Sequence, residues 1–343
     1  MKLKNRLGLA GSLSLVGVAL SFLSQLIFSY YFGTSAELDA YWIAFAIMNF
    51  LSFPLTALRE ALVSEIHELS LADKNLTSIY FSKALSLIIF TAIFLALFGL
   101  FLSDPLINLV AGDGKPVFHT EVYAKLLWLA PALILLALSD TFNSLLTSYN
   151  RVTLQMVSRI LAAGSTIAVI AFSAAWMGSQ ALVFGFVIGQ AINTVVLGYV
   201  LHRQGLFFKP FHFGGLGQDF LRISGALICS YGLSQIYALY EKAVFLNFGV
   251  GLVSAFQYSV SVTNIVITVF GLSLANLLWP RFLKYISDHN YPRLYDEVAI
   301  SSKLLFIILG WICALVFLNA QWIVEIIFAR GAFGEDATTL TTL

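Results

Sequence analysis

Polar and charged side chains recur along one face of an otherwise apolar segment, Ala40 to Val63. Their spacing of i, i+3, i+7 and i+10 or i+11 returns to the same side of a helix at each step. The residues are Asn49, Ser52, Thr56, Arg59 and Glu60. Because such groups are costly to bury in lipid, the pattern predicts a helix face that lines a wet cavity and contacts a substrate. Alternatively, Arg59 and Glu60 simply lie at the membrane surface.

Two later segments carry the same kind of stripe at the same spacing. The first consists of Ser230, Ser234, Tyr237 and Glu241. The second is uncharged and consists of Gln257, Ser261, Asn264 and Thr268. Hydroxyl and amide groups also hydrogen-bond neighbouring helices to one another in lipid, which is the structural alternative for any single residue. Taken together, the three stripes predict walls of one polar cavity.

Three carboxylates are candidates for coupling transport to a proton or a sodium ion. Asp140 lies midway along the apolar segment Tyr123 to Leu146, where it either binds an ion or hydrogen-bonds a neighbouring helix. Glu241 lies on its polar stripe near the end of a segment. Asp39 precedes the apolar part of its segment, where an acidic side chain also favours the start of a helix.

No catalytic or nucleotide-binding motif accompanies these residues. The sequence contains neither H-E-x-x-H, nor G-x-S-x-G with its partners, nor a phosphate-binding G-x-x-x-x-G-K-[ST]. Cys229 and Cys313 lie in apolar runs without metal-ligand spacing, and the net charge of +1 does not indicate a nucleic-acid partner. We therefore expect neither an enzyme nor a metal or cofactor. Transport of a substrate would be driven by ion gradients or by the substrate's own gradient.

The elements that position these residues are membrane-spanning helices. Of the 343 residues, 59% are hydrophobic and 11% charged, and the mean hydropathy is +0.88, so the chain is predicted to be an all-α polytopic membrane protein. Nine apolar runs are long enough to span a bilayer. They are Leu7 to Tyr31, Ala40 to Val63, Phe81 to Leu102, Tyr123 to Leu146, Val157 to Met177, Ala181 to Leu201, Ile223 to Phe245, Val253 to Leu278 and Leu304 to Leu318.

Basic residues indicate the orientation of these spans. With the N-terminus in the cytoplasm, fifteen of the 19 Lys and Arg residues fall on the cytoplasmic side. The positive-inside rule therefore predicts an inner-membrane protein with a cytoplasmic N-terminus.

Landmarks separated by 216 residues indicate an internal repeat. Phe32-Gly33 corresponds to Phe248-Gly249, and both pairs follow an expected span at the same side of the membrane. Six spans separate equivalent positions, so the two halves have the same orientation. The predicted organisation is a six-helix lobe over 1–204, a cytoplasmic linker over 205–220 and a partial second lobe over 221–343. Because the second lobe stops after three spans, we expect a protein that is incomplete at its C-terminal side.

Three segments resemble the MurJ/MviN lipid II flippase family, within the superfamily of multidrug, oligosaccharidyl-lipid and polysaccharide exporters. They are FGTSAELDAYWIAFAIMNFL (32–51), GLVSAFQYSVSVTNIVITVFGLSLANLLWPRF (251–282) and IIFARGAFGEDATTLTTL (326–343). The resemblance implies two lobes that face each other across a central cavity. It also implies transport of a lipid-linked precursor, within the membrane lipids, by alternating access.

The chain departs from the family pattern at its arginines, which the resemblance implies contact the pyrophosphate of lipid II. The matching positions hold Val18, Ser24, Ser52 and Phe53, and the charged cluster of the eighth span is Val260, Ser261 and Asn264. Asp39 matches a charged family position.

These departures favour an undecaprenyl-pyrophosphate-linked oligosaccharide, such as an exopolysaccharide or O-antigen precursor, over the peptidoglycan precursor. Arg59, with Lys83 or Arg159, would contact the phosphate. The alternatives are a multidrug or organic-cation antiporter that uses Asp140 and Glu241, and a non-functional truncated membrane protein.

Overall fold

The protein is built from long helices, as its apolar runs predict. The computed structural model describes residues 3–72, 74–112, 116–149, 151–203, 214 and 216–342, and within them the chain contains no strand. The helices are α1 (Leu3–Phe32), α2 (Ala36–Ala72), α3 (Lys74–Phe101), α4 (Ser103–Ala111), α5 (Pro116–Ser148), α6 (Val152–Met177), α7 (Gln180–Arg203), α8 (Gln218–Phe248), α9 (Leu252–Ser287), α10 (Tyr291–Leu318), α11 (Ala320–Phe328) and α12 (Glu335–Thr342). Most of the predicted linker, 205–220, lies outside the described residues, and its last three residues already belong to α8.

Seven of these helices are long and apolar enough to cross a membrane, within the part of the chain that the structure describes. They are α1, α2, α3, α5, α6, α7 and α10. Helices suit this environment because each satisfies its own backbone hydrogen bonds where no water is present. The expected count of nine spans is not confirmed. The other two expected spans form α8 and α9, helices of 31 and 36 residues.

The helix bounds agree closely with a repeat of 216 residues. Shifting α1 and α2 by this amount gives 219–248 and 252–288, and the structure places α8 at Gln218–Phe248 and α9 at Leu252–Ser287. The shift likewise relates α3 to α10 and the short helix α4 to α11. The same order of long and short helices therefore occurs twice in the chain.

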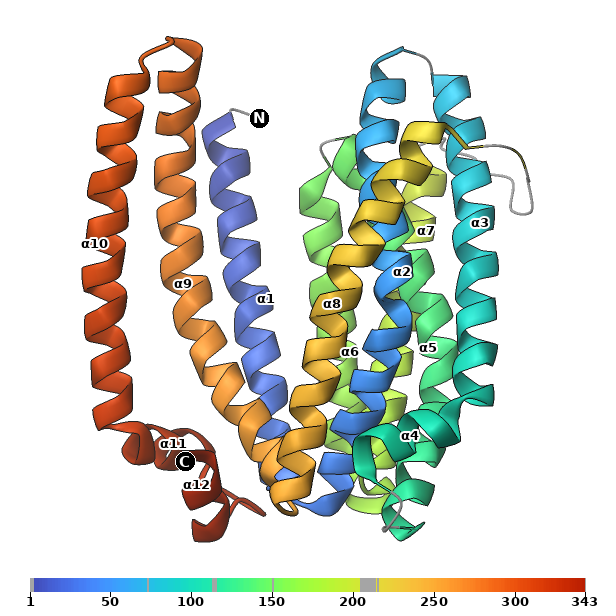
Figure 1. Ribbon diagram of the computed structural model, residues 1–343, viewed down its shortest axis with the longest axis vertical. Helices are drawn as coiled ribbons and strands as arrows, with labels where there is room; N and C mark the ends of the chain where they lie inside the picture. Colours follow the sequence, from blue (N-terminus) through green and yellow to red (C-terminus); the bar gives the residue numbers. More distant parts are fainter. Residues whose placement is uncertain are drawn as a thin grey trace.

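The helices form two groups that meet at one end of the structure and separate at the other. In Figure 1, α2 to α8 form the group on the right, and α9 and α10 form the group on the left, with α1 between them. Although α8 begins the second repeat, it packs along α2 and also contacts α4, while α1 packs mainly on α6. The two groups approach at the lower end of the view, near α11 and α12, and diverge toward the end that carries the N-terminus.

Close backbone contacts hold the lower end together, and we call this region, formed by residues 30–35, 251–254 and 329–334, the closed end. The hydroxyl of Tyr258 donates to the carbonyl oxygen of Gly33 over 2.9 Å, and the amide of Ala332 donates to the carbonyl oxygen of Tyr30 over 2.8 Å. Gly251 has a φ of +86°, and a Cβ there would overlap the carbonyl oxygen of Thr34. Only glycine meets both requirements at this position.

Replacing Gly251 with Ala is expected to lower the free energy of unfolding by about 1–3 kcal/mol, because the side chain is strained at this φ and collides with Thr34. Thermal unfolding of the purified protein in detergent would measure the change. Gly164→Ala is the matched control, since its added Cβ meets no atom within 4 Å inside helix α6. Equal melting temperatures for the two variants would contradict the prediction.

Candidate functional site

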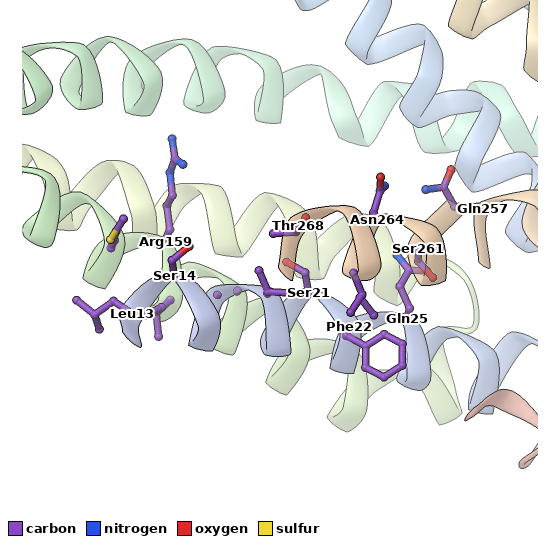
Figure 2. A pocket seen from close by; sticks show the side chains of 16 residues that line it. Leu13, Ser14, Ser21, Phe22, Gln25, Arg159, Gln257, Ser261, Asn264 and Thr268 are labelled. Atoms are coloured by element: carbon purple, nitrogen blue, oxygen red, sulfur yellow. The ribbon is translucent and has the colours of Figure 1, made fainter. Parts of the chain in front are cut away.

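A cavity of about 480 Å³ lies between α1, α6 and α9. Its polar lining is Ser14, Ser21, Gln25, Arg159, Gln257, Ser261, Asn264 and Thr268. All four members of the uncharged stripe of α9 are therefore at this surface, because their spacing puts them on one side of the helix. Figure 2 shows them opposite the polar residues of α1, with Arg159 extending from α6.

The charge of this cavity comes from one side chain. Arg159 is exposed and makes no ion pair in the described part of the chain. Among the described residues that line the cavity, none is acidic. Arg159 nevertheless acts electrostatically on Asp140 of α5, so the cavity lies within reach of a second group of charges.

That second group joins three helices, and we call it the charge cluster: Arg59 and Glu60 of α2, Asp140 of α5 and Tyr231 of α8. Arg59 lies 3.0 Å from Glu60 and 3.7 Å from Asp140. The hydroxyl of Tyr231 donates to Glu60 in a short hydrogen bond. The side chains of Arg59 and Asp140 are 24% and 25% exposed, so the cation is partly buried and held by two carboxylates.

The remaining predicted residues of α2 are buried or half-buried. Ser52 is buried and donates to the carbonyl oxygen of Asn49 over 2.8 Å within its own helix. Asn49 and Thr56 are half-buried, and none of these three side chains lines the cavity beside α9.

The stripe of α8 is placed differently from that of α9. Ser234 and Tyr237 are exposed and Glu241 is half-buried, and none of them lines the cavity between α1, α6 and α9. Helix α8 packs on α2 through the face that carries Gly232, which lies against the ring of Phe53. The residues of the stripe lie on other faces of α8. The structure thus does not bring the three predicted stripes into one cavity.

Asp39 caps α9, and not the start of its own helix as the sequence predicts. Helix α2 begins after Ser35, whose hydroxyl accepts from the amide of Leu38. The carboxylate of Asp39 instead accepts from the amide of Gly251 over 2.6 Å, from the amide of Ser254 over 2.8 Å and from the hydroxyl of Ser254. It therefore caps α9, in the other repeat, and it is fully buried. A cap in another helix is invisible to local sequence spacing.

Lys242 is a functional candidate that sequence reasoning missed. It lies near the C-terminal end of α8, yet it is 9% exposed. Its Nζ donates to Oε1 of Gln257 over 2.8 Å and lies 5.1 Å from the ring centre of Phe256. Lys242 therefore joins α8 to the cavity-lining stripe of α9. The spacing of the stripe that contains its neighbour Glu241 does not reveal this contact, because the contact joins two different helices.

Replacing Asp39 with Ala is expected to lower the free energy of unfolding by about 1–3 kcal/mol, because the first turn of α9 loses its charged cap. Thermal unfolding in detergent would measure the loss. Glu37→Ala is the control: Glu37 is in the same turn of α2 but makes no hydrogen bond to α9 among the described residues. A loss of equal size in Glu37→Ala would show that Asp39 acts only through the charge of its own helix.

The charge cluster is expected to show energetic coupling between Arg59 and Asp140. A double-mutant cycle with Arg59→Ala and Asp140→Ala should give a coupling energy of about 0.5–2 kcal/mol, because Arg59→Ala leaves Asp140 without its cation and Asp140→Ala leaves Arg59 with Glu60 alone. Stability measured by thermal or denaturant unfolding provides the four values. Arg59→Ala combined with Glu37→Ala should be additive, since these positions are about six helical turns apart. Additivity in both cycles would show that the ion pair makes no measurable contribution to stability.

Comparisons with known proteins agree with this architecture. The family model described as "Lipid II flippase MurJ" matches residues 28–342. Proteins named "Probable lipid II flippase MurJ" from Buchnera aphidicola subsp. Baizongia pistaciae and Borreliella burgdorferi are each 23% identical, over 333 and 330 residues. In both cases the match covers 94% of this chain and 64% of the relative, so the chain spans less than two thirds of their length.

Solved structures share the fold. A structure titled "Lipid II flippase MurJ, inward closed conformation" matches with a TM-score of 0.78 at 20% identity, over 97% of this chain and 70% of that one. An inward-facing multidrug resistance MATE family transporter matches with a TM-score of 0.75 at 15% identity, over 94% of this chain and 75% of the other. The all-α, two-lobed fold of these transporters is the fold of this protein. With the family model covering most of its length, the chain belongs to the lipid II flippase MurJ family.

Proposed function

We propose that this protein moves a lipid-linked precursor across the bacterial inner membrane. The substrate would be an undecaprenyl-pyrophosphate-linked oligosaccharide or peptidoglycan precursor, which passes from the inner to the outer leaflet. The observation that carries the proposal is a polar, cation-bearing cavity between α1, α6 and α9 in a chain of this family. A polar head group needs such a surface because it would lose its hydrogen bonds to water in the lipid interior, at a high cost in free energy.

Alternating access is supported by the contrast between the two ends of the structure. The halves are joined at the closed end by a small set of directed contacts, chiefly the cap of Asp39 on α9, while α9 and α2 diverge toward the other end (Figure 1). With the N-terminus in the cytoplasm, this arrangement would face inward. Breaking the cap and the hydrogen bond of Tyr258 to Gly33 would open the outer side.

Arg159 is the proposed contact for the phosphate. It lines the cavity without an ion pair among the described residues, and a guanidinium can make paired hydrogen bonds to phosphate oxygens. Arg59 is less suited to direct contact, because Glu60 and Asp140 already neutralise it. In this proposal the charge cluster, through its carboxylate Asp140, is where a proton or sodium ion would couple to transport.

An organic-cation antiporter is the less supported alternative. It would need an acidic group to bind its substrate, and the described lining of the cavity contains none. The likeness to multidrug transporters is one of fold, at 15% identity.

Replacing Arg159 with Ala is expected to lower the rate of lipid flipping about tenfold or more, because a charge-assisted phosphate contact contributes about 1.5–3 kcal/mol. The assay uses the protein in liposomes that contain fluorescent undecaprenyl-pyrophosphate-linked sugars, with chemical quenching of the outer leaflet. Arg151→Ala is the control, since Arg151 is an exposed arginine just before α6 that does not line the cavity. Unchanged flipping in Arg159→Ala would remove Arg159 from the mechanism, and no flipping by the unaltered protein would refute the proposal itself.

A further inference from the structure

The cavity between α1, α6 and α9 has an unusual chemical balance for a surface that handles a charged lipid. Seven of its lining residues carry neutral hydroxyl or amide groups and one carries a charge. Neutral hydrogen-bonding groups therefore dominate the polar surface. Its volume of about 480 Å³ falls within the roughly 300–1,000 Å³ that is typical of small-ligand sites.

Several of these groups have unused hydrogen-bonding capacity. The exposed side chain of Ser21 lines the cavity from α1. Ser261 donates to the carbonyl oxygen of Tyr258 in its own helix, which leaves its oxygen free to accept. Asn264 is exposed toward the cavity, and its amide makes no hydrogen bond in the described part of the chain. The wall thus presents both donors and acceptors.

This combination fits a sugar better than a second anionic group. A sugar hydroxyl both donates and accepts, so it can pair with the amide of Asn264 and also with the hydroxyl oxygen of Ser261. A carboxylate only accepts, and it needs a cation or several donors to offset its desolvation. The single cation of the lining, Arg159, is already required by the phosphate. The peptide of a peptidoglycan precursor adds free carboxylates for which the described lining offers no further cation.

We propose that this cavity recognises the uncharged sugars of a lipid-linked glycan through Ser21, Ser261 and Asn264, and that it discriminates against the peptide-bearing precursor. In Figure 2 the labelled residues of α1 and α9 lie on neighbouring helices, and Arg159, on α6, is displaced from Asn264 and Ser261. This arrangement separates the sugar-binding surface from the phosphate contact. The inference rests on the proposed function and specifies its substrate class.

The test compares the binding of three fluorescent lipids by the purified full chain in lipid nanodiscs. They are undecaprenyl pyrophosphate bearing a trisaccharide of neutral hexoses, lipid II, and undecaprenyl pyrophosphate without sugar. The neutral glycan lipid is expected to bind at least tenfold more tightly than lipid II. Asn264→Leu should weaken binding of the neutral glycan lipid about tenfold and leave binding of the sugar-free lipid unchanged, because it removes a donor and an acceptor and adds no charge.

Two further variants keep the outcome clear. Ser261→Ala is a smaller change that should weaken the same ligand severalfold, and size-exclusion chromatography checks that each variant is folded. Thr263→Val is the matched control, since Thr263 is an exposed neighbour on α9 that bonds within its own helix and does not line the cavity.

Three results would overturn the inference. Lipid II that binds as tightly as the neutral glycan lipid would refute the substrate class and leave the flippase proposal standing. Asn264→Leu that weakens all three lipids equally would refute sugar recognition at this wall. If none of the three lipids binds and none is flipped in liposomes, both the inference and the proposed function fail.

Discussion

The carboxylate of Asp39 joins the two repeats where they come closest. At the position equivalent to the cap residue Ser35 of α2, helix α9 has Gly251, which lacks a side chain and cannot cap its own helix. Asp39 supplies the missing acceptor from the other repeat, and the partial positive charge of the α9 N-terminus favours its negative charge. The position of α9, and with it the cavity wall that α9 carries, depends on this contact.

Helices at equivalent positions of the two repeats begin and end at equivalent residues, but they pack against different neighbouring helices. Helices α1 and α8 are equivalent in the repeat, yet α1 packs on α6 and α8 packs along α2. Gln25 consequently lines the cavity, while its equivalent Glu241 lies outside it. Equivalent helices thus provide different surfaces, and a transporter built from two similar halves can bind an asymmetric ligand.

Local properties of the sequence could be predicted because they depend on spacing along one helix. The apolar runs marked the long helices, and the shift of 216 residues agrees with their bounds. The spacing from Gln257 to Thr268 put these residues on one face of a helix, and in the structure they line the cavity. Contacts between helices could not be predicted in this way. The pairing of Arg59 with Asp140, the cap that Asp39 gives to α9 and the turning of Ser234 away from the cavity all depend on which helices become neighbours.

Gln257 belongs to two structures at once, since it lines the cavity and its Oε1 holds the ammonium group of Lys242. An amide oxygen can accept two hydrogen bonds, so a ligand hydroxyl can donate to it beside Lys242. A ligand bound there would contact the same side chain that connects α8 to α9.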